Sequence, residues 1–248
     1  MKQCPQCQHV YVDEATKFCA VDGSPVVDLS YAVGGFPSLP VSPSEIVLLF
    51  GEQFAGQSEG AVVKVPISGA LVDAGQLGLK MVAAAVLACE QAGSIRLQVG
   101  AKGGIRGGTC LNLSRGPIPN VRWQHGSIEY RLCGIMSQGI TRQLAHVVTQ
   151  LWQRDFRRNV AGAWIHCRTL VLQGLATRNL ISASPDFSVV HVAPALASLP
   201  PEETTEPLKQ LFMETSAQRQ AIWAALQQDI QAGVNKRAGG PKHAIFFG

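Results

Sequence analysis

The chain lacks a long apolar segment. Its longest strongly apolar run, Met81–Cys89, has nine residues, whereas about 20 are needed to cross a bilayer. It also begins Met-Lys-Gln-Cys-Pro, without the apolar stretch of a secretory signal. We therefore expect a cytoplasmic protein without a transmembrane segment, whose contacts with membranes are at most peripheral.

Motifs that carry catalytic chemistry are also missing. The six histidines show no HExxH-type spacing, and no GxSxG is present. His166 and Cys167 are adjacent on an expected helix, so their side chains point to different faces. A triad assembled from distant residues would leave no local trace, but nothing in the sequence indicates one. The sequence predicts no catalytic residues and no enzymatic activity.

Cysteines are few, and most of them are isolated. The 248 residues include 7 cysteines, of which Cys89, Cys110, Cys133 and Cys167 are scattered singly. This spacing is not that of a disulfide scaffold, so we expect reduced, buried thiols. With 46% hydrophobic and 15% charged residues, the chain can bury a sizeable core and is expected to be globular.

The remaining three cysteines form the strongest motif. Cys4 and Cys7 are a CxxC pair, and Cys19 and Asp22 repeat the same spacing. Such pairs bring four ligands to one tetrahedral zinc ion. Zinc accepts carboxylate oxygen, so Asp22 is a sound fourth ligand, and His9 is the alternative. Four protein ligands close the coordination sphere, which is typical of structural zinc.

The same residues carry a resemblance to a known family. The pattern CPQC…FCAVDGSPV resembles the short zinc ribbons at the N-termini of many bacterial proteins, in the CxxC…FCxxDG variant. The likeness covers about residues 4–26, roughly a tenth of the chain. It implies that Cys4, Cys7, Cys19 and Asp22 are the ligands, and it implies nothing about the partner.

The charge is distributed unevenly along the chain. Residues 100–180 carry 11 basic and 2 acidic side chains, a net charge of +9, although the whole chain carries only +4. This excess indicates an anionic partner, either nucleic acid or an anionic lipid surface. The alternative is that the arginines are dispersed and only solvate the fold. The candidate anion-binding residues are Lys102, Arg106, Arg154, Arg157, Arg158 and Arg168.

Hydrophobic periodicity predicts an α+β, mainly helical protein with two tandem winged-helix-like units. Ser42 or Ser44 is expected to cap the first helix. The predicted divisions are a zinc ribbon (1–27), a linker (28–43), a first unit (44–125), a second unit (126–193), a C-terminal helix (194–234) and a flexible tail (235–248).

Each unit is predicted to contain helices followed by a β-hairpin. In the first unit the expected elements are a strand at 61–65, a helical pattern from 68 to 92 and strands at 94–99 and 109–113. In the second they are helices at 138–152 and 160–172, a cap at Gly174 and strands at 175–181 and 187–192. A final helix is expected at 206–232.

Two segments bear on nucleic-acid binding. The glycine-rich segment 100–108 lacks the GK[ST] ending of a phosphate-binding loop and leads into a strand, so it is interpreted as a hairpin tip. The run Met81–Cys89 has no polar face, which predicts a buried helix and argues against base readout. Trp152 and Phe156 alternate with arginines, as core anchors or as part of an anion-binding surface.

A second resemblance concerns the order of helices and glycines. The segments from Ser44-Glu-Ile-Val-Leu-Leu through Gly93-Ser-Ile-Arg-Leu to Arg168-Thr-Leu-Val and Gly174 are similar in order to the Golgi phosphoprotein three-like domain. That resemblance, over residues 42–192, implies binding of phosphoinositide-type headgroups. It would make Arg157 and Arg158 the lipid contacts.

We therefore expect a zinc-ribbon adaptor or regulatory protein that binds a protein partner. Nucleic-acid binding through residues 100–180 and peripheral binding to anionic lipid are the alternatives. Structural zinc is the only cofactor that the sequence indicates. The C-terminal Ile245-Phe-Phe is either a docking peptide or a segment that folds back on its own domain.

Overall fold

The computed structural model describes residues 2–4, 10–11, 13, 15–28, 40–57, 60–101, 108–117, 122–137, 139–151 and 160–237. It has an α+β fold in which 53% of the residues are helical, which confirms the mainly helical class. The helices are α1 (Pro43–Leu49), the 3₁₀ helix η1 (Gly51–Gln53), α2 (Ala74–Gln91), α3 (Ile128–Met136), α4 (Leu144–Leu151), α5 (Val160–Thr177), α6 (Pro194–Ala197), α7 (Pro201–Gln218) and α8 (Gln220–Arg237). The strands are β1 (Lys2–Gln3), β2 (Val10–Tyr11), β3 (Val27–Asp28), β4 (Val62–Lys64), β5 (Leu71–Asp73), β6 (Ile95–Ala101), β7 (Thr109–Arg115), β8 (Arg142–Gln143), β9 (Ile181–Ala183) and β10 (Val190–Val192).

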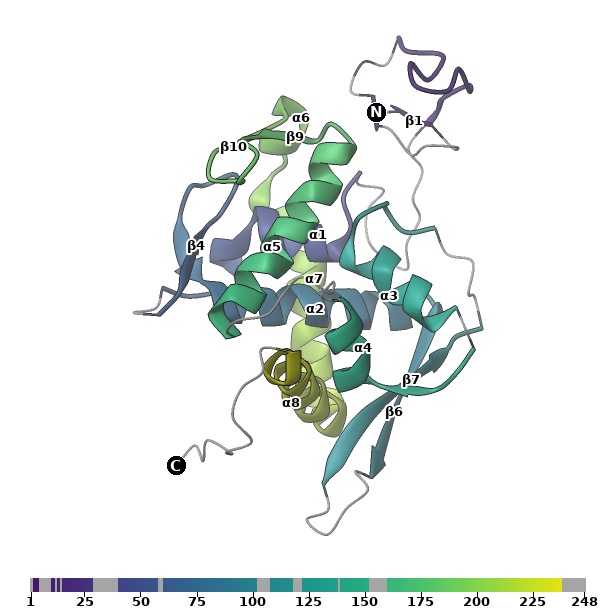
Figure 1. The fold of residues 1–248 in the computed structure, drawn as a ribbon, viewed down its shortest axis with the longest axis vertical. Coiled ribbons are helices and arrows are strands. Elements are labelled where there is room, and N and C mark those ends of the chain that lie inside the picture. Colours follow the sequence, from purple (N-terminus) through teal and green to yellow (C-terminus); the bar gives the residue numbers. More distant parts are fainter. Residues whose placement is uncertain are drawn as a thin grey trace.

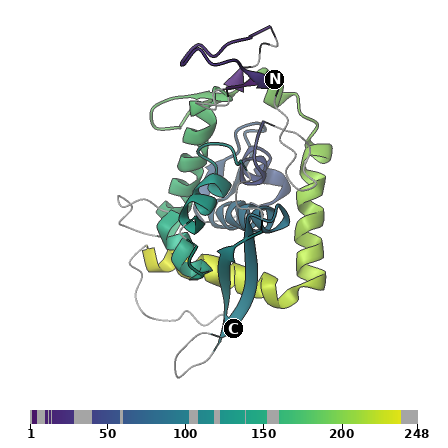
Figure 2. The same cartoon turned by 90° about the vertical axis from the view of Figure 1, so that its right-hand side faces the viewer.

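Helix α2 lies at the centre of the helical body. Figures 1 and 2 show α5 on one side of it and α7 on the opposite side, with α8 crossing below. Helices α1, α3 and α5 make the most extensive contacts with α2. The described part of the chain contains no helix long and apolar enough to span a membrane.

The sequence of α2 explains its central position. Asp73 caps its N-terminus by accepting a hydrogen bond from the Gln76 backbone N–H at 2.7 Å. Each residue of Met81–Cys89 is at most 1% exposed. The prediction of a buried helix is therefore confirmed, and the apolar face that lacks base-reading groups packs within the protein's own core.

The elements predicted around α2 are largely present. Ser42 is the N-cap of α1, and its backbone N–H donates to the Glu45 carboxylate at 2.7 Å in a capping box. Strands β6 and β7 pair antiparallel from Ile95↔Arg115 to Ala101↔Thr109. The glycine-rich segment therefore joins two strands of a hairpin, as predicted, although residues 102–107 lie outside the described residues.

Three predicted elements were wrong, two in the second half of the chain and one in the first. Residues 138–152 do not form one helix, because Arg142 and Gln143 form β8, which pairs with β7 before α4 begins. The segment 175–181 is not a strand, since α5 continues to Thr177 and β9 starts only at Ile181. In the first half, residues 71–73 form β5 instead of continuing the helical pattern.

The single C-terminal helix is also corrected. The segment contains α6, α7 and α8, and α7 ends where Arg219 leaves helical geometry at φ −128° and ψ 46°. The Arg219 guanidinium donates two hydrogen bonds of 2.7 Å to the Glu90 carboxylate. This pair holds the corner to the end of α2, so that α8 turns across and packs against α4 and β7.

The two predicted units share one hydrophobic core. A single cluster of buried residues runs from Val41 to Val234, and β8 from the second half extends the β6–β7 sheet of the first. The domain boundaries at 125 and 193 remain predictions. The linker and tail predictions fall mainly on residues 29–39 and 238–248, outside the described residues.

Gly174 does not cap a helix. It lies inside α5 and packs directly against Gly126, which has φ +85°. A Cβ at Gly174 would lie 2.8 Å from the Gly126 carbonyl carbon and 2.9 Å from its oxygen. These are backbone atoms, so the helix or the loop before α3 would have to move.

We therefore expect Gly174→Ala to lower the free energy of unfolding by about 1–3 kcal/mol, the usual cost of overpacking. Gly134→Ala is the matched control, because Gly134 lies in α3 with no heavy atom within 4 Å of its Cβ position. Alanine there is expected to raise stability by about 0.5–1 kcal/mol through helix propensity. Urea unfolding monitored by circular dichroism measures both, and equal effects would contradict this packing.

Candidate metal centre

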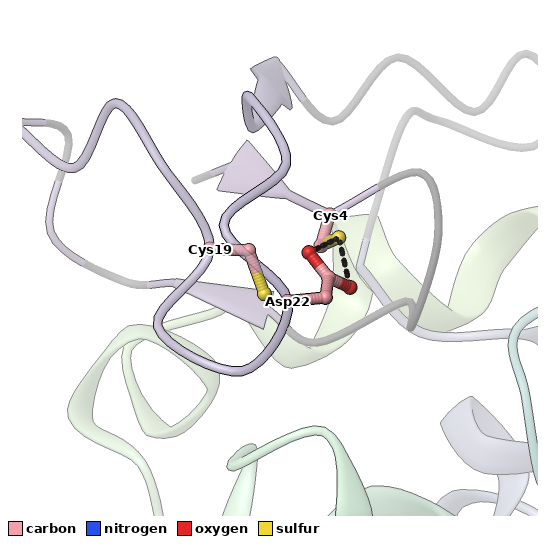
Figure 3. Close-up of side chains that lie close together, drawn as sticks. All are labelled: Cys4, Cys19 and Asp22. Carbon is pink, nitrogen blue, oxygen red and sulfur yellow. Dashed lines mark hydrogen bonds between the residues drawn. The ribbon is translucent and has the colours of Figure 1, made fainter.

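Three of the four predicted ligands lie together in the N-terminal segment. Strand β1 pairs with both β2 and β3, and Cys4 follows directly after β1. Cys19 and Asp22 belong to the turn between the paired residues Phe18 and Pro25. Figure 3 shows the side chains of Cys4, Cys19 and Asp22 converging from these two parts of the segment.

The ligand atoms have distances suited to one metal ion. The two thiol sulfurs and a carboxylate oxygen all lie within 4.8 Å of one another. The Cys4 Sγ is 3.2 Å from Asp22 Oδ2 and 3.4 Å from Oδ1. With Zn–S of about 2.3 Å and Zn–O of about 2.1 Å, tetrahedral ligands are separated by roughly 3.5–3.8 Å. Only small side-chain adjustments are needed to bind an ion, so the donor set fits zinc.

The turn around Cys19 is built to hold a thiolate. The Cys19 sulfur accepts a hydrogen bond from the Tyr11 hydroxyl at 3.1 Å and one from the Val21 backbone N–H at 3.4 Å. The same Tyr11 oxygen accepts from the Ala20 N–H at 2.7 Å, which fixes the ring. Gly23 has φ +72° and lets the chain turn back so that its N–H reaches the Cys19 carbonyl at 2.9 Å.

The thiols and the carboxylate differ in their exposure to solvent. Cys4 and Cys19 are 0% and 4% exposed, whereas Asp22 is exposed and its Oδ1 also accepts from the Ser24 N–H at 2.9 Å. The remaining candidates, Cys7 and His9, lie outside the described residues. The cluster can hold a metal ion. That Cys7 is a further ligand, and that Asp22 rather than His9 is the fourth, stay predictions.

The predicted anion-binding residues fall mostly outside the described residues. Lys102, Arg106, Arg154, Arg157 and Arg158 all do so, as do Trp152 and Phe156. Arg168 lies in α5, half-buried, and its guanidinium donates to the Phe187 carbonyl at 3.5 Å. Burial lowers the pKa of Arg168. The convergence of these cations on one surface therefore stays a prediction.

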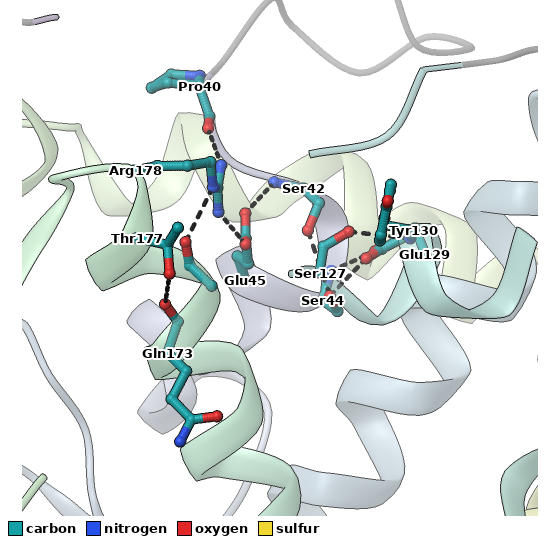
Figure 4. A network of polar contacts seen from close by, with 11 residues as sticks. Pro40, Ser42, Ser44, Glu45, Ser127, Glu129, Tyr130, Gln173, Thr177 and Arg178 are labelled. Carbon is teal, nitrogen blue, oxygen red and sulfur yellow. Dashed lines mark hydrogen bonds and ion pairs between the residues drawn. The ribbon is translucent and has the colours of Figure 1, made fainter. Parts of the chain in front are cut away.

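A buried polar network was missed by the sequence analysis. Glu45, Glu129 and Arg178 are each at most 1% exposed. The Arg178 guanidinium pairs with Glu45 and also donates to the Pro40 carbonyl at 2.8 Å and the Gly174 carbonyl at 3.2 Å. Ser44 donates to Glu129 from its backbone N–H at 2.7 Å and its hydroxyl at 2.6 Å. Figure 4 shows how this network joins α1, α3 and α5.

Two buried carboxylates lie in this network, and Arg178 pairs with one of them, Glu45. Burial outweighs the attraction of Arg178 and raises the pKa of Glu45 from 4.5 to about 7, and the nearby Glu129 charge raises it further. Burial also raises the pKa of Glu129, against the hydrogen bonds from Ser44. Desolvation by burial, which disfavours the charged form, is thus the main cause of both shifts.

The raised pKa of Glu45 predicts a pH-dependent stability. Between pH 4.5 and about 7 the folded state retains a proton that the unfolded state releases, so the free energy of unfolding falls as pH rises. Glu45→Gln should reduce this slope, which is at most about 1.4 kcal/mol per pH unit for one group. Urea unfolding across this window measures the slope, and an unchanged slope in Glu45→Gln would contradict the assignment. Glu129 shifts in the same direction and leaves a residual slope.

No protein-family model matches the chain, and no curated protein and no solved structure matches it. The candidate site is therefore defined by its own geometry. This geometry shows a small segment that can hold a metal ion, joined to a mainly helical body with a buried polar network.

Proposed function

We propose that the protein is a cytoplasmic, non-enzymatic adaptor whose N-terminal zinc ribbon binds a protein partner. Cys4, Cys7, Cys19 and Asp22 are the zinc ligands in this proposal, and the closed coordination sphere makes the zinc structural. The observation that carries it is the convergence of Cys4, Cys19 and Asp22 within 4.8 Å. The ion would fold a segment whose strands have only two residues each.

Exposed apolar side chains support a protein partner. Phe18 and Val21 are 64% and 66% exposed, and they immediately precede Cys19 and Asp22. Large apolar side chains held on a metal-folded turn are suited to insertion into an apolar pocket of another protein.

The body is proposed to consist of two winged-helix-like units. In the first, α1 and α2 precede the β6–β7 hairpin, and in the second, α3, α4 and α5 precede the β9–β10 hairpin.

Binding to an anionic partner is the second proposal. Of the 11 basic and 2 acidic residues in 100–180, one of each, Arg178 and Glu129, is buried in the network. The others retain a strong positive excess, which favours nucleic acid or anionic lipid. The resemblance to the Golgi phosphoprotein three-like domain favours lipid headgroups, with Arg157 and Arg158 as contacts.

A comparison of binding assays separates these proposals. Proteins retained from lysate by the zinc-loaded chain are identified by mass spectrometry, and the double variant Phe18→Ser/Val21→Ser should lose them while keeping its zinc. The matched control Met213→Ser alters another exposed apolar side chain, 61% exposed on α7, and should retain them. Electrophoretic shift and flotation on anionic vesicles test the second proposal. Binding that weakens steeply with salt and survives the Phe18 and Val21 changes would replace the first proposal with the second.

A further inference from the structure

Two cysteines that are distant in sequence are in contact in the helical body. The Sγ atoms of Cys89, in the last turn of α2, and Cys133, in α3, lie 3.8 Å apart across 44 residues of chain. Both are free thiols. Forming a disulfide requires the sulfurs to approach to about 2.05 Å, which is about 1.8 Å closer. Helices α2 and α3 already pack against each other, so the two side chains start in contact.

The surroundings give the two thiols different roles. Cys89 is 0% exposed, while Cys133 is partly exposed. Hydrogen bonding by Cys89 lowers the pKa of Cys133 against the effect of burial, and Ser94 and Trp123 contribute further hydrogen bonds. Burial raises the pKa of Cys89. Because the thiolate is the reactive form, Cys133 is the attacking thiol and Cys89 the resolving one.

We propose that Cys89 and Cys133 form a reversible disulfide by reaction with a small-molecule disulfide of the glutathione class. The Cys133 thiolate attacks one sulfur of the oxidised glutathione, forms a mixed disulfide and releases one glutathione thiolate. Cys89 then attacks the Cys133 sulfur, its proton passes to solvent or to the released thiolate, and the second glutathione leaves. Two protein thiols are oxidised to one disulfide, and one oxidised glutathione is reduced to two thiols.

The disulfide would fasten the end of α2 to α3. These elements are distant in the chain, so the bond closes a long loop in the unfolded state and stabilises the folded one. We expect the melting temperature to rise by about 5–10 °C on oxidation, and to return on reduction. The site is independent of the metal centre and of the proposed partner binding.

The test uses the full-length, zinc-loaded chain treated with oxidised glutathione. Free thiols are then blocked with N-ethylmaleimide, and the digested peptides are identified by mass spectrometry. We expect one linked pair that contains Cys89 and Cys133 and disappears with dithiothreitol. Cys89→Ser should stop at a mixed disulfide on Cys133, and Cys133→Ser should react at neither position.

Cys167→Ser is the matched control. Cys167 is buried in α5, and burial raises its pKa to about 12, so its removal should leave the linked pair unchanged. The proposal is overturned if the wild-type chain stays at the mixed disulfide, if the pair forms only in denaturant, or if Cys133 is alkylated no faster than Cys167. Circular dichroism of each variant shows whether the fold is retained, and melting of the wild-type chain before and after oxidation supplies a readout that needs no variant.

Discussion

Replacing Arg178 with methionine is expected to lower the free energy of unfolding by about 3–5 kcal/mol at a pH above 7, because it leaves a buried carboxylate without its counterion. Arg178 is 1% exposed and Glu45 is 0% exposed, so water cannot replace the lost guanidinium. Two backbone carbonyls, those of Pro40 and Gly174, also lose their donors. The cost should be smaller near pH 5, where Glu45 can be protonated.

Urea unfolding of two further variants makes this prediction specific. Glu45→Met/Arg178→Met removes both charges and should recover most of the lost stability, as is found for buried ion pairs replaced by apolar groups. Arg219→Met breaks the pair with Glu90, in which the arginine side chain is 39% exposed, and should cost no more than about 1 kcal/mol. The account of the network fails if Arg178→Met and Arg219→Met are equally stable, or if the double variant is no more stable than Arg178→Met.

The second large effect is expected at the metal centre. Cys19→Ser should lower zinc affinity by more than about 100-fold. Loss of a residue that only supports a ligand costs up to about 100-fold, and Cys19 is itself a proposed ligand, 4% exposed and held by two hydrogen bonds. The N-terminal segment should lose its structure, because a closed zinc site supplies the folding energy of such a module. The melting of the helical body should not change.

Competition with a chromophoric zinc chelator measures these affinities. Cys110→Ser is the control, because Cys110 lies in β7 and should not affect zinc. Asp22→Ala should weaken binding and His9→Ala should not. Equal affinity in Cys19→Ser and the wild-type chain would exclude Cys19 as a ligand, and a loss in His9→Ala would make His9 the fourth ligand.

The sequence predicted features that depend on local spacing. The convergence of Cys4, Cys19 and Asp22, a cap of the first helix at Ser42 or Ser44, the burial of Met81–Cys89 and the β6–β7 hairpin all follow from short local patterns. Each of these is set by the period of a helix or strand or by a turn that brings neighbouring ligands together. These features could therefore be predicted from the sequence alone.

Features that depend on contacts between distant segments could not be predicted. The pairing of Arg178 with Glu45 spans 133 residues, and the Cys89–Cys133 contact spans 44. The sequence predicts helix at β8, because its two residues acquire strand geometry only by pairing with β7. The sequence predicts a helix cap at Gly174, because the packing of this residue against Gly126 cannot be recognised from the neighbouring residues. Glu45 follows Ser44, and Arg178 stands between Thr177 and Asn179, so neither residue is conspicuous in an apolar segment.

The central claim is that Cys4, Cys7, Cys19 and Asp22 hold one structural zinc ion. Metal analysis of protein purified without chelator, followed by replacement with Co²⁺, tests it most directly. The account predicts about one zinc per chain, together with a cobalt spectrum of tetrahedral, thiolate-rich coordination that weakens in Cys19→Ser. Less than about half an equivalent of zinc, or a cobalt spectrum of octahedral oxygen coordination, would contradict it.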